Sequence, residues 1–321
     1  MKNRVLIVLV LVAMLLPVVS FAQREEVGDA ITFHDTTWYD RGFDFYIGAG
    51  MFWGGKKSAL YYNGSKYNEC NLNYIFNNPT DPTSSYYKAL QEAVIKVYPY
   101  VSYSDKISYK ESDLNLNPTY NLAVSINLGV RYKIRDNWGI SLSYNFARLK
   151  TVNKLLLNIE PQLPSNTYRL PELTLLGVED RSMIDLSASY LFSDVSRLVK
   201  PFLEVGAQFN YVRVKKFDAV LLDDRNNPVY TQTLLDIYGG ANYVPGVDMQ
   251  TYDVIYGGPG FGGSFSAGLK IVVNKFVSLD PTFYGCFSYL HLRPYGEKVT
   301  TFNYGVMLRV VVNDFFMHNN M

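Results

Sequence analysis

Apolar and polar residues alternate with a period of two in eight separate stretches of the chain. Such alternation is typical of a β-strand, because successive side chains point to opposite faces. In the first stretch Phe43, Phe45 and Ile47 share one face, while Asp44 and Tyr46 lie on the other. The eight expected strands cover residues 43–53, 122–133, 138–146, 184–190, 203–210, 264–273, 278–289 and 303–312.

The length and polarity of these stretches favour a barrel in a membrane. Most approach the length of about 9–11 residues that a tilted membrane strand needs, and an even number of strands suits closure. A water-soluble barrel or sandwich is the alternative, but it would place the large apolar faces inside and charge outside. Here the polar faces are rich in Gly, Ser and Asn. The sequence predicts an all-β fold: an eight-stranded antiparallel up-and-down transmembrane β-barrel with long extracellular loops.

The connections between the expected strands also alternate in length. Those after the second, fourth and sixth strands are short, and those after the first, third and fifth are long. Short periplasmic turns and long outer loops are the usual asymmetry of outer-membrane barrels. We therefore expect residues 41–313 to form the barrel, with both ends in the periplasm.

The N-terminal residues have the order of a secretory signal peptide. Lys2 and Arg4 precede an apolar run over residues 5–19, and Ser20 and Ala22 supply small residues before Gln23. This order predicts a signal peptide over residues 1–22, cleaved near Ala22 and Gln23. Residues 23–40 would then be a periplasmic segment and residues 314–321 a short periplasmic tail, which places the protein in the bacterial outer membrane.

Composition agrees with strands that face lipid. The chain has 27 Tyr and 19 Phe, and only 18% of its residues are charged, against about a quarter in an average soluble protein. The net charge of +1 gives no electrostatic reason to expect binding to nucleic acid.

Charged residues also occur on the faces expected to point inward. An eight-stranded barrel is just wide enough for side chains to fill it, and an unpaired charge is costly to bury. Four acids and four bases therefore predict an ion-pair network that plugs the lumen; a selective pore or proton path is the alternative. The eight residues are Asp44, Arg131, Lys133, Asp185, Glu204, Lys270, Asp280 and Arg309.

No catalytic, cofactor-binding or metal site is predicted. Of the three histidines, only His291 lies near the outer end of a strand, and it falls on an apolar, lipid-facing side. Cys70 and Cys286 lack metal-ligand spacing, and whether they form a disulfide stays open. The glycine-rich residues 257–263 are not followed by Lys-Ser or Lys-Thr, so they indicate a flexible re-entry into the sixth strand instead of a phosphate loop.

The first long loop, residues 56–120, is rich in Tyr and Asn and contains one expected helix. That helix begins near Ser85 and ends at Val97 or Tyr98, because Pro99 disfavours a helical residue before it. Tyr-rich and Asn-rich surfaces suit adaptable contacts with proteins or glycans, whereas a packed lid over the barrel mouth is equally compatible. The expected partner-binding aromatics are Tyr61, Tyr62, Tyr86, Tyr87, Tyr243, Tyr252 and Tyr256.

The chain resembles the small eight-stranded outer-membrane barrels, the group that includes the membrane domain of OmpA-like proteins. The Ser-Phe-Ala-Gln cut, the Phe-Tyr-Ile-Gly-Ala-Gly first strand and the long Tyr/Asn loops look most like members from Bacteroidetes. The resemblance covers residues 41–313 and is generic. One departure is that the chain continues past Phe315 and Phe316 to Met321, where such barrels often end on an aromatic residue.

The resemblance implies a protein that contacts outer-membrane lipid and is not an enzyme. We expect a plugged barrel that acts as a binding or assembly component through its outer loops, with another outer-membrane or secretion-complex protein as partner. The alternatives are a narrow transporter or channel for a small or apolar ligand, and a barrel enzyme.

Overall fold

The computed structural model describes residues 42–68, 70–76, 85–135, 137–160, 170–192, 198–235, 256–274, 276–292 and 298–313. The expected signal peptide, N-terminal segment and C-terminal tail lie outside these residues. No helix in the described part of the chain is long and apolar enough to span a membrane.

Eight antiparallel strands form a closed ring, which confirms the predicted fold class. Each strand pairs with its neighbour in the ring, and β1 pairs with β11 to close it, with Ile47 opposite Val310. All eight expected strands are present. They are β1 (Gly42–Trp53), β3 (Ala123–Lys133), β4 (Trp138–Leu156), β6 (Glu172–Leu191), β7 (Val199–Leu222), β9 (Gly257–Val272), β10 (Val277–Leu290) and β11 (Val299–Val312).

The outer and inner faces of the ring have the polarity that the sequence predicts. Large apolar side chains point outward and stay exposed, with Ile47 and Leu186 each 57% exposed. Polar side chains such as Asn127 and Asn145 point inward and are buried. An apolar exterior around a polar interior is the arrangement of a barrel whose solvent is lipid.

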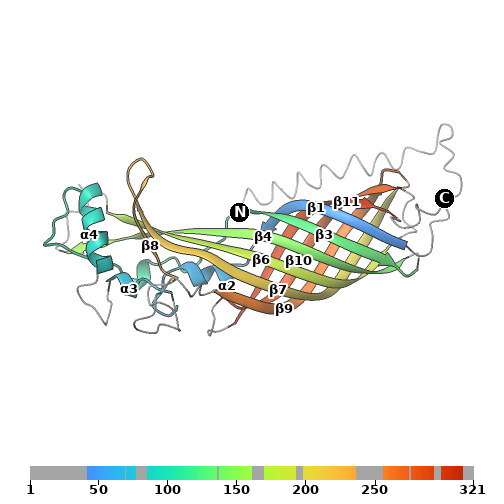
Figure 1. The fold of residues 1–321 in the computed structure, drawn as a ribbon, viewed down its shortest axis with the longest axis horizontal. Helices are drawn as coiled ribbons and strands as arrows, with labels where there is room; N and C mark the ends of the chain where they lie inside the picture. Colours follow the sequence, from blue (N-terminus) through green and yellow to red (C-terminus); the bar gives the residue numbers. More distant parts are fainter. Residues whose placement is uncertain are drawn as a thin grey trace, which may run out of the picture.

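Three strands continue well beyond the barrel, which the sequence analysis did not predict. β4, β6 and β7 have 19, 20 and 24 residues, and Figure 1 shows them projecting from one end of the ring. β8 (Pro228–Thr233) pairs with the far end of β7, and β2 (Lys106–Ser108) pairs with β5 (Asn158–Glu160). Much of the expected third and fifth connections is therefore strand. We call the part of the molecule outside the ring the extension.

The polarity of the two faces inverts where the strands leave the ring. On β4 the outward Phe146 is followed by the outward Arg148 and Lys150, while the inward Leu149 and Leu155 are buried. β7 changes in the same way after Tyr211. Its inward side becomes apolar with Val212, Val214, Phe217 and Leu221. A strand that passes from lipid into water must invert its pattern, because the apolar face then has to be covered by protein.

The first long loop supplies that cover. Its helical segments are α2 (Lys56–Ala59), η1 (Leu60–Tyr62), α3 (Asn73–Phe76), α4 (Ser85–Val97) and η2 (Glu111–Asp113). In α4 the residues Leu90, Ala93 and Val94 form one buried face, as the spacing i, i+3, i+4 produces on a helix. The predicted end of this helix at Val97 is confirmed. We call the described residues of this loop the lid. The lid packs against the inward side of the extended strands, and the two form one apolar cluster.

One further expectation on local structure was wrong. The glycine-rich residues from Gly257 onward do not form a re-entry loop but belong to β9 and pair with β7 and β10. Glycine is required there by close packing: a Cβ on Gly260 would lie 2.0 Å from the carbonyl oxygen of Tyr289. Gly257 itself has φ of +122°, a conformation that only glycine adopts easily.

Candidate functional site

The centre of the lumen holds a carboxylate shared by two arginines. Glu204 on β7 accepts from Arg131 of β3 and from Arg309 of β11, each at 2.8 Å. Asp280 of β10 lies 3.6 Å from the other terminal nitrogen of Arg131. All four residues are buried, and both guanidinium groups also lie over the ring of Tyr46. Side chains from five strands therefore meet across the lumen and fill it.

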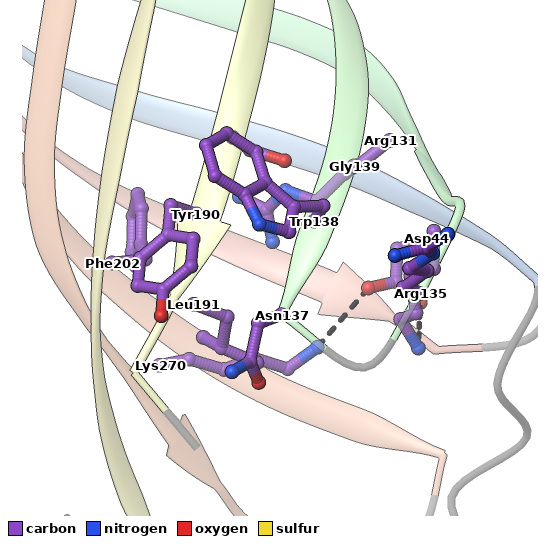
Figure 2. Close-up of a pocket in the computed structure, with 12 residues that line it drawn as sticks. Asp44, Arg131, Arg135, Asn137, Trp138, Gly139, Tyr190, Leu191, Phe202 and Lys270 are labelled. Atoms are coloured by element: carbon purple, nitrogen blue, oxygen red, sulfur yellow. Dashed lines mark hydrogen bonds and ion pairs between the residues drawn. The ribbon is translucent and has the colours of Figure 1, made fainter. Parts of the chain in front are cut away.

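A second ion-pair cluster lies at the end of the ring where the short turns are. The Asp44 carboxylate lies 2.9 Å from the Lys133 ammonium and 3.1 Å from that of Lys270. Figure 2 shows Asp44 and Lys270 among the residues that line a pocket here, together with Trp138 and Tyr190. The pocket that these residues help to line has a volume of about 30 Å³, room for roughly one or two water molecules.

Asp185 differs from the other seven residues of the predicted network. It makes no ion pair with a described residue, and its carboxylate instead accepts from Asn145 at 2.6 Å and from Gln208 at 3.0 Å. The Tyr284 hydroxyl donates to it at 3.1 Å. The prediction of an ion pair for Asp185 was therefore wrong, because alternation shows which side chains point inward but not which levels of the lumen they reach.

Sequence reasoning missed a third cluster, at the end of the lumen beneath the lid. Arg181 on β6 pairs with Glu179 at 2.6 Å, and it donates to Asn303 of β11 and to Ser58 of α2 at 2.6 and 2.8 Å. The Tyr62 hydroxyl donates to Glu179 at 2.7 Å. Both charged residues are fully buried. The signal in the sequence was the charged pair Glu179 and Arg181, which lies in the expected third connection.

Hydrogen bonds connect this third cluster to Asp185. Asn303 donates to the Ser288 hydroxyl at 3.3 Å, and Ser288 donates to Gln208 at 2.7 Å. Gln208 in turn donates to Asp185. Side chains thus occupy the lumen from the lid down to the middle of the ring, and the shared carboxylate of Glu204 and the cluster around Asp44 occupy further levels.

The expected partner-binding aromatics do not form one surface. Tyr61 and Tyr62 are buried, at 4% and 0% exposed, so the prediction that they contact a partner was wrong. Both pack from the lid against Phe217 of β7. Tyr86 and Tyr87 are half-buried, and the Tyr87 hydroxyl accepts from the amide of Ile107. The remaining three are Tyr256, which is buried, and Tyr243 and Tyr252, which lie outside the described residues.

Among the described residues, the two cysteines and His291 form no catalytic arrangement. Cys70 and Cys286 are both buried and are not joined by a disulfide. Cys70 lies in the lid near the Tyr61 hydroxyl, and Cys286 lies in the lumen near Asn303. His291 is half-buried at the end of β10. Within the described ranges no three His, Cys, Asp or Glu side chains are grouped as metal ligands.

The closed ring, its apolar exterior and its filled polar lumen define a small outer-membrane β-barrel protein. No protein-family model matches the chain, and no curated protein matches it.

Among solved structures, the chain is similar to Neisserial surface protein A, with 13% identity, a TM-score of 0.35, and coverage of 84% of this chain and 96% of that chain. It is similar to the N-terminal β-barrel domain of OprF from Pseudomonas aeruginosa, with 9% identity, a TM-score of 0.32, and coverage of 85% and 98%. OprG from the same organism gives 9% identity, a TM-score of 0.31, and coverage of 85% and 95%. The fold itself rests on the strand pairing of this chain.

Proposed function

We propose that the protein does not conduct through its lumen and instead anchors the extension in the outer membrane, where the extension binds a protein or glycan partner. The observation that carries this proposal is the set of buried polar clusters that occupy the lumen at successive levels. A solute that passed through would have to displace side chains that are paired and hydrogen-bonded in a low-dielectric interior, which is costly.

The extension has the properties of a rigid platform. Its sheet is continuous with the barrel wall, since β6 and β7 pair from residues 173 and 221 at the far end to residues 191 and 202 within the ring. Arg181 ties the lid to the opposite wall through Ser58 and Asn303. Binding to a platform that is already ordered avoids much of the entropy that a flexible loop would lose.

The exposed side chains of the extension supply a contact surface of the right chemistry. Tyr67, Tyr103 and Leu116 are 80%, 71% and 69% exposed, and all three lie outside the ring, where a partner can reach them. Tyrosines provide rigid, amphipathic contact area at a low entropic cost. These residues, and not the buried Tyr61 and Tyr62, are the ones that we assign to partner binding.

The test is affinity purification of the full chain from native outer membranes after chemical cross-linking. Deletion of residues 57–118 is unsuitable, because it would uncover the apolar side of the extension. A triple variant with Tyr67→Ala, Tyr103→Ala and Leu116→Ala should instead lose a partner that the wild-type protein retains.

The matched control changes three exposed polar residues of the extension, Lys88→Ala, Lys110→Ala and Thr231→Ala, and should keep the partner. Equal recovery of the partner by both variants would contradict the assignment of these three residues. Altered solute uptake, with no partner lost, would favour the narrow transporter instead.

A further inference from the structure

The outward faces of β4 and β7 carry a group of cations at the point where the barrel wall ends. They are Arg148 and Lys150 on β4, and Arg213, Lys215 and Lys216 on β7. All five are exposed. Among the described residues of the eight ring strands, only β4 and β7 carry Lys or Arg on the outward face. We call these five residues the cationic patch.

Strand pairing places the cations of the patch on both sides of β6. Arg148 lies opposite Asp180 of β6, and Asp180 lies opposite Arg213. One step further out, Lys150 lies opposite Val178, which lies opposite Lys216. Neighbouring strands are about 4.8 Å apart, so cations flank β6 on both sides at a separation of about 10 Å. Lys215 occupies the extra position of the β-bulge in β7 between these two rows.

Acidic neighbours neutralise only part of this charge. Asp180 receives two hydrogen bonds from the Arg148 guanidinium, at 2.7 and 3.1 Å, and Asp218 pairs with Lys216 at 3.0 Å. Within the described part of the chain, no carboxylate forms an ion pair with Lys150, Arg213 or Lys215. Five cations against two carboxylates leave three positive charges on one side of the molecule.

The height of the patch coincides with the edge of a membrane. On β4 the outward residues from Trp138 to Phe146 are apolar, and Arg148 is the next outward residue. Ten residues that each rise about 3.3 Å on a strand tilted by about 40° span about 25 Å, which is the height of the apolar band of an outer-membrane barrel. On β7 the same spacing separates Leu203 from Arg213. The side chains of the patch therefore begin where lipid headgroups begin.

We propose that the cationic patch binds the phosphorylated headgroup of a lipid in the outer leaflet. Arginine and lysine together suit this chemistry, because a guanidinium can bind a phosphate through two hydrogen bonds and an ammonium acts as a compact charge. The apolar residues Tyr144 and Phe209 lie below the patch on the same face, where the acyl chains would run. The inference depends on the membrane position of the barrel but not on the protein or glycan partner proposed for the extension.

The test is native mass spectrometry of the full chain in detergent, titrated with diphosphorylated lipid A or with phosphatidylcholine. Neutralising three cations in the variant K150Q/R213Q/K215Q should reduce the affinity for lipid A by at least about tenfold, since each cation near an anionic surface contributes appreciably. Binding of phosphatidylcholine should not change. The control variant K88Q/K96Q/K106Q removes the same charge from exposed lysines of the extension and should bind lipid A as the wild type does.

Two results would overturn the proposal. Equal lipid A binding by the patch variant and the wild type would show that the patch does not recognise the headgroup. Competition by inorganic phosphate at concentrations comparable to those of lipid A would assign the patch to a soluble anion. A shift in gel migration between heated and unheated samples distinguishes a folded variant from an unfolded one. The single variant R213Q provides a milder test, and its affinity for lipid A should fall by about threefold or more.

Discussion

Replacing Glu204 by glutamine removes the carboxylate that two buried guanidinium groups share. The Arg131 and Arg309 side chains are 7% and 1% exposed and each lies 2.8 Å from a different oxygen of Glu204. For charges about 3.5 Å apart at an effective dielectric constant of about 20, each attraction amounts to about 5 kcal/mol. The cost of burying the arginines remains after the substitution, while Asp280, 3.6 Å from Arg131, compensates in part.

We therefore expect Glu204→Gln to lower the free energy of unfolding by about 3–5 kcal/mol, as is usual when one partner of a buried pair is removed. The measurement is urea-induced unfolding of the barrel in lipid vesicles, followed by tryptophan fluorescence. Asp180→Asn is the control, since it breaks a pair with Arg148, which is 63% exposed, and should cost less than about 1 kcal/mol.

A double variant separates the charge effect from loss of packing. Adding Arg309→Met to Glu204→Gln removes one of the two stranded cations, so stability should partly recover. A loss for Glu204→Gln no larger than that for Asp180→Asn would refute the reasoning, because the lumen would then be wet enough to screen these charges.

Three other predictions follow from the same structure. Leu186→Arg on the outward face should cost about 2–4 kcal/mol in lipid vesicles, whereas a barrel in water would tolerate it; unfolding in urea measures this. Arg181→Met should leave the barrel folded but loosen the lid, which limited proteolysis should detect as faster cleavage of the extension. Unchanged proteolysis would count against the link through Ser58. Burial and the neighbouring Glu179 carboxylate raise the pKa of Tyr62 well above its ordinary value. The stability that neutral Tyr62 contributes is therefore present below about pH 10 and is lost as the pH rises further. Tyr62→Phe should flatten this dependence of stability on pH, measured by tyrosinate absorbance and circular dichroism.

The barrel could be predicted from the sequence because one physical rule applies along each membrane strand. Lipid requires an apolar outer face and the lumen accepts a polar one, so residues such as Ile47 and Asp44 alternate throughout. The same rule assigned inward positions to Arg131, Glu204 and Arg309, whose side chains meet in the lumen.

The extension was missed because its strands obey the opposite rule. After Phe146 charged residues appear on the outward face of β4 and the buried inward face becomes apolar with Leu149, so the alternation persists but its polarity is inverted. From the sequence alone, the loss of outward apolar residues predicts the end of the strand. The role of Tyr62 was missed for a related reason: its burial depends on Phe217 and Glu179, which are more than 100 residues away in the sequence and were themselves assigned to loops.

Single-channel recording in planar lipid bilayers tests the central claim most directly. With the lumen occupied by the clusters around Asp44, Glu204 and Arg181, the purified full chain should insert without producing steady conductance steps. A stable open channel in the wild-type protein would contradict the filled lumen and, with it, the proposal that function resides in the extension.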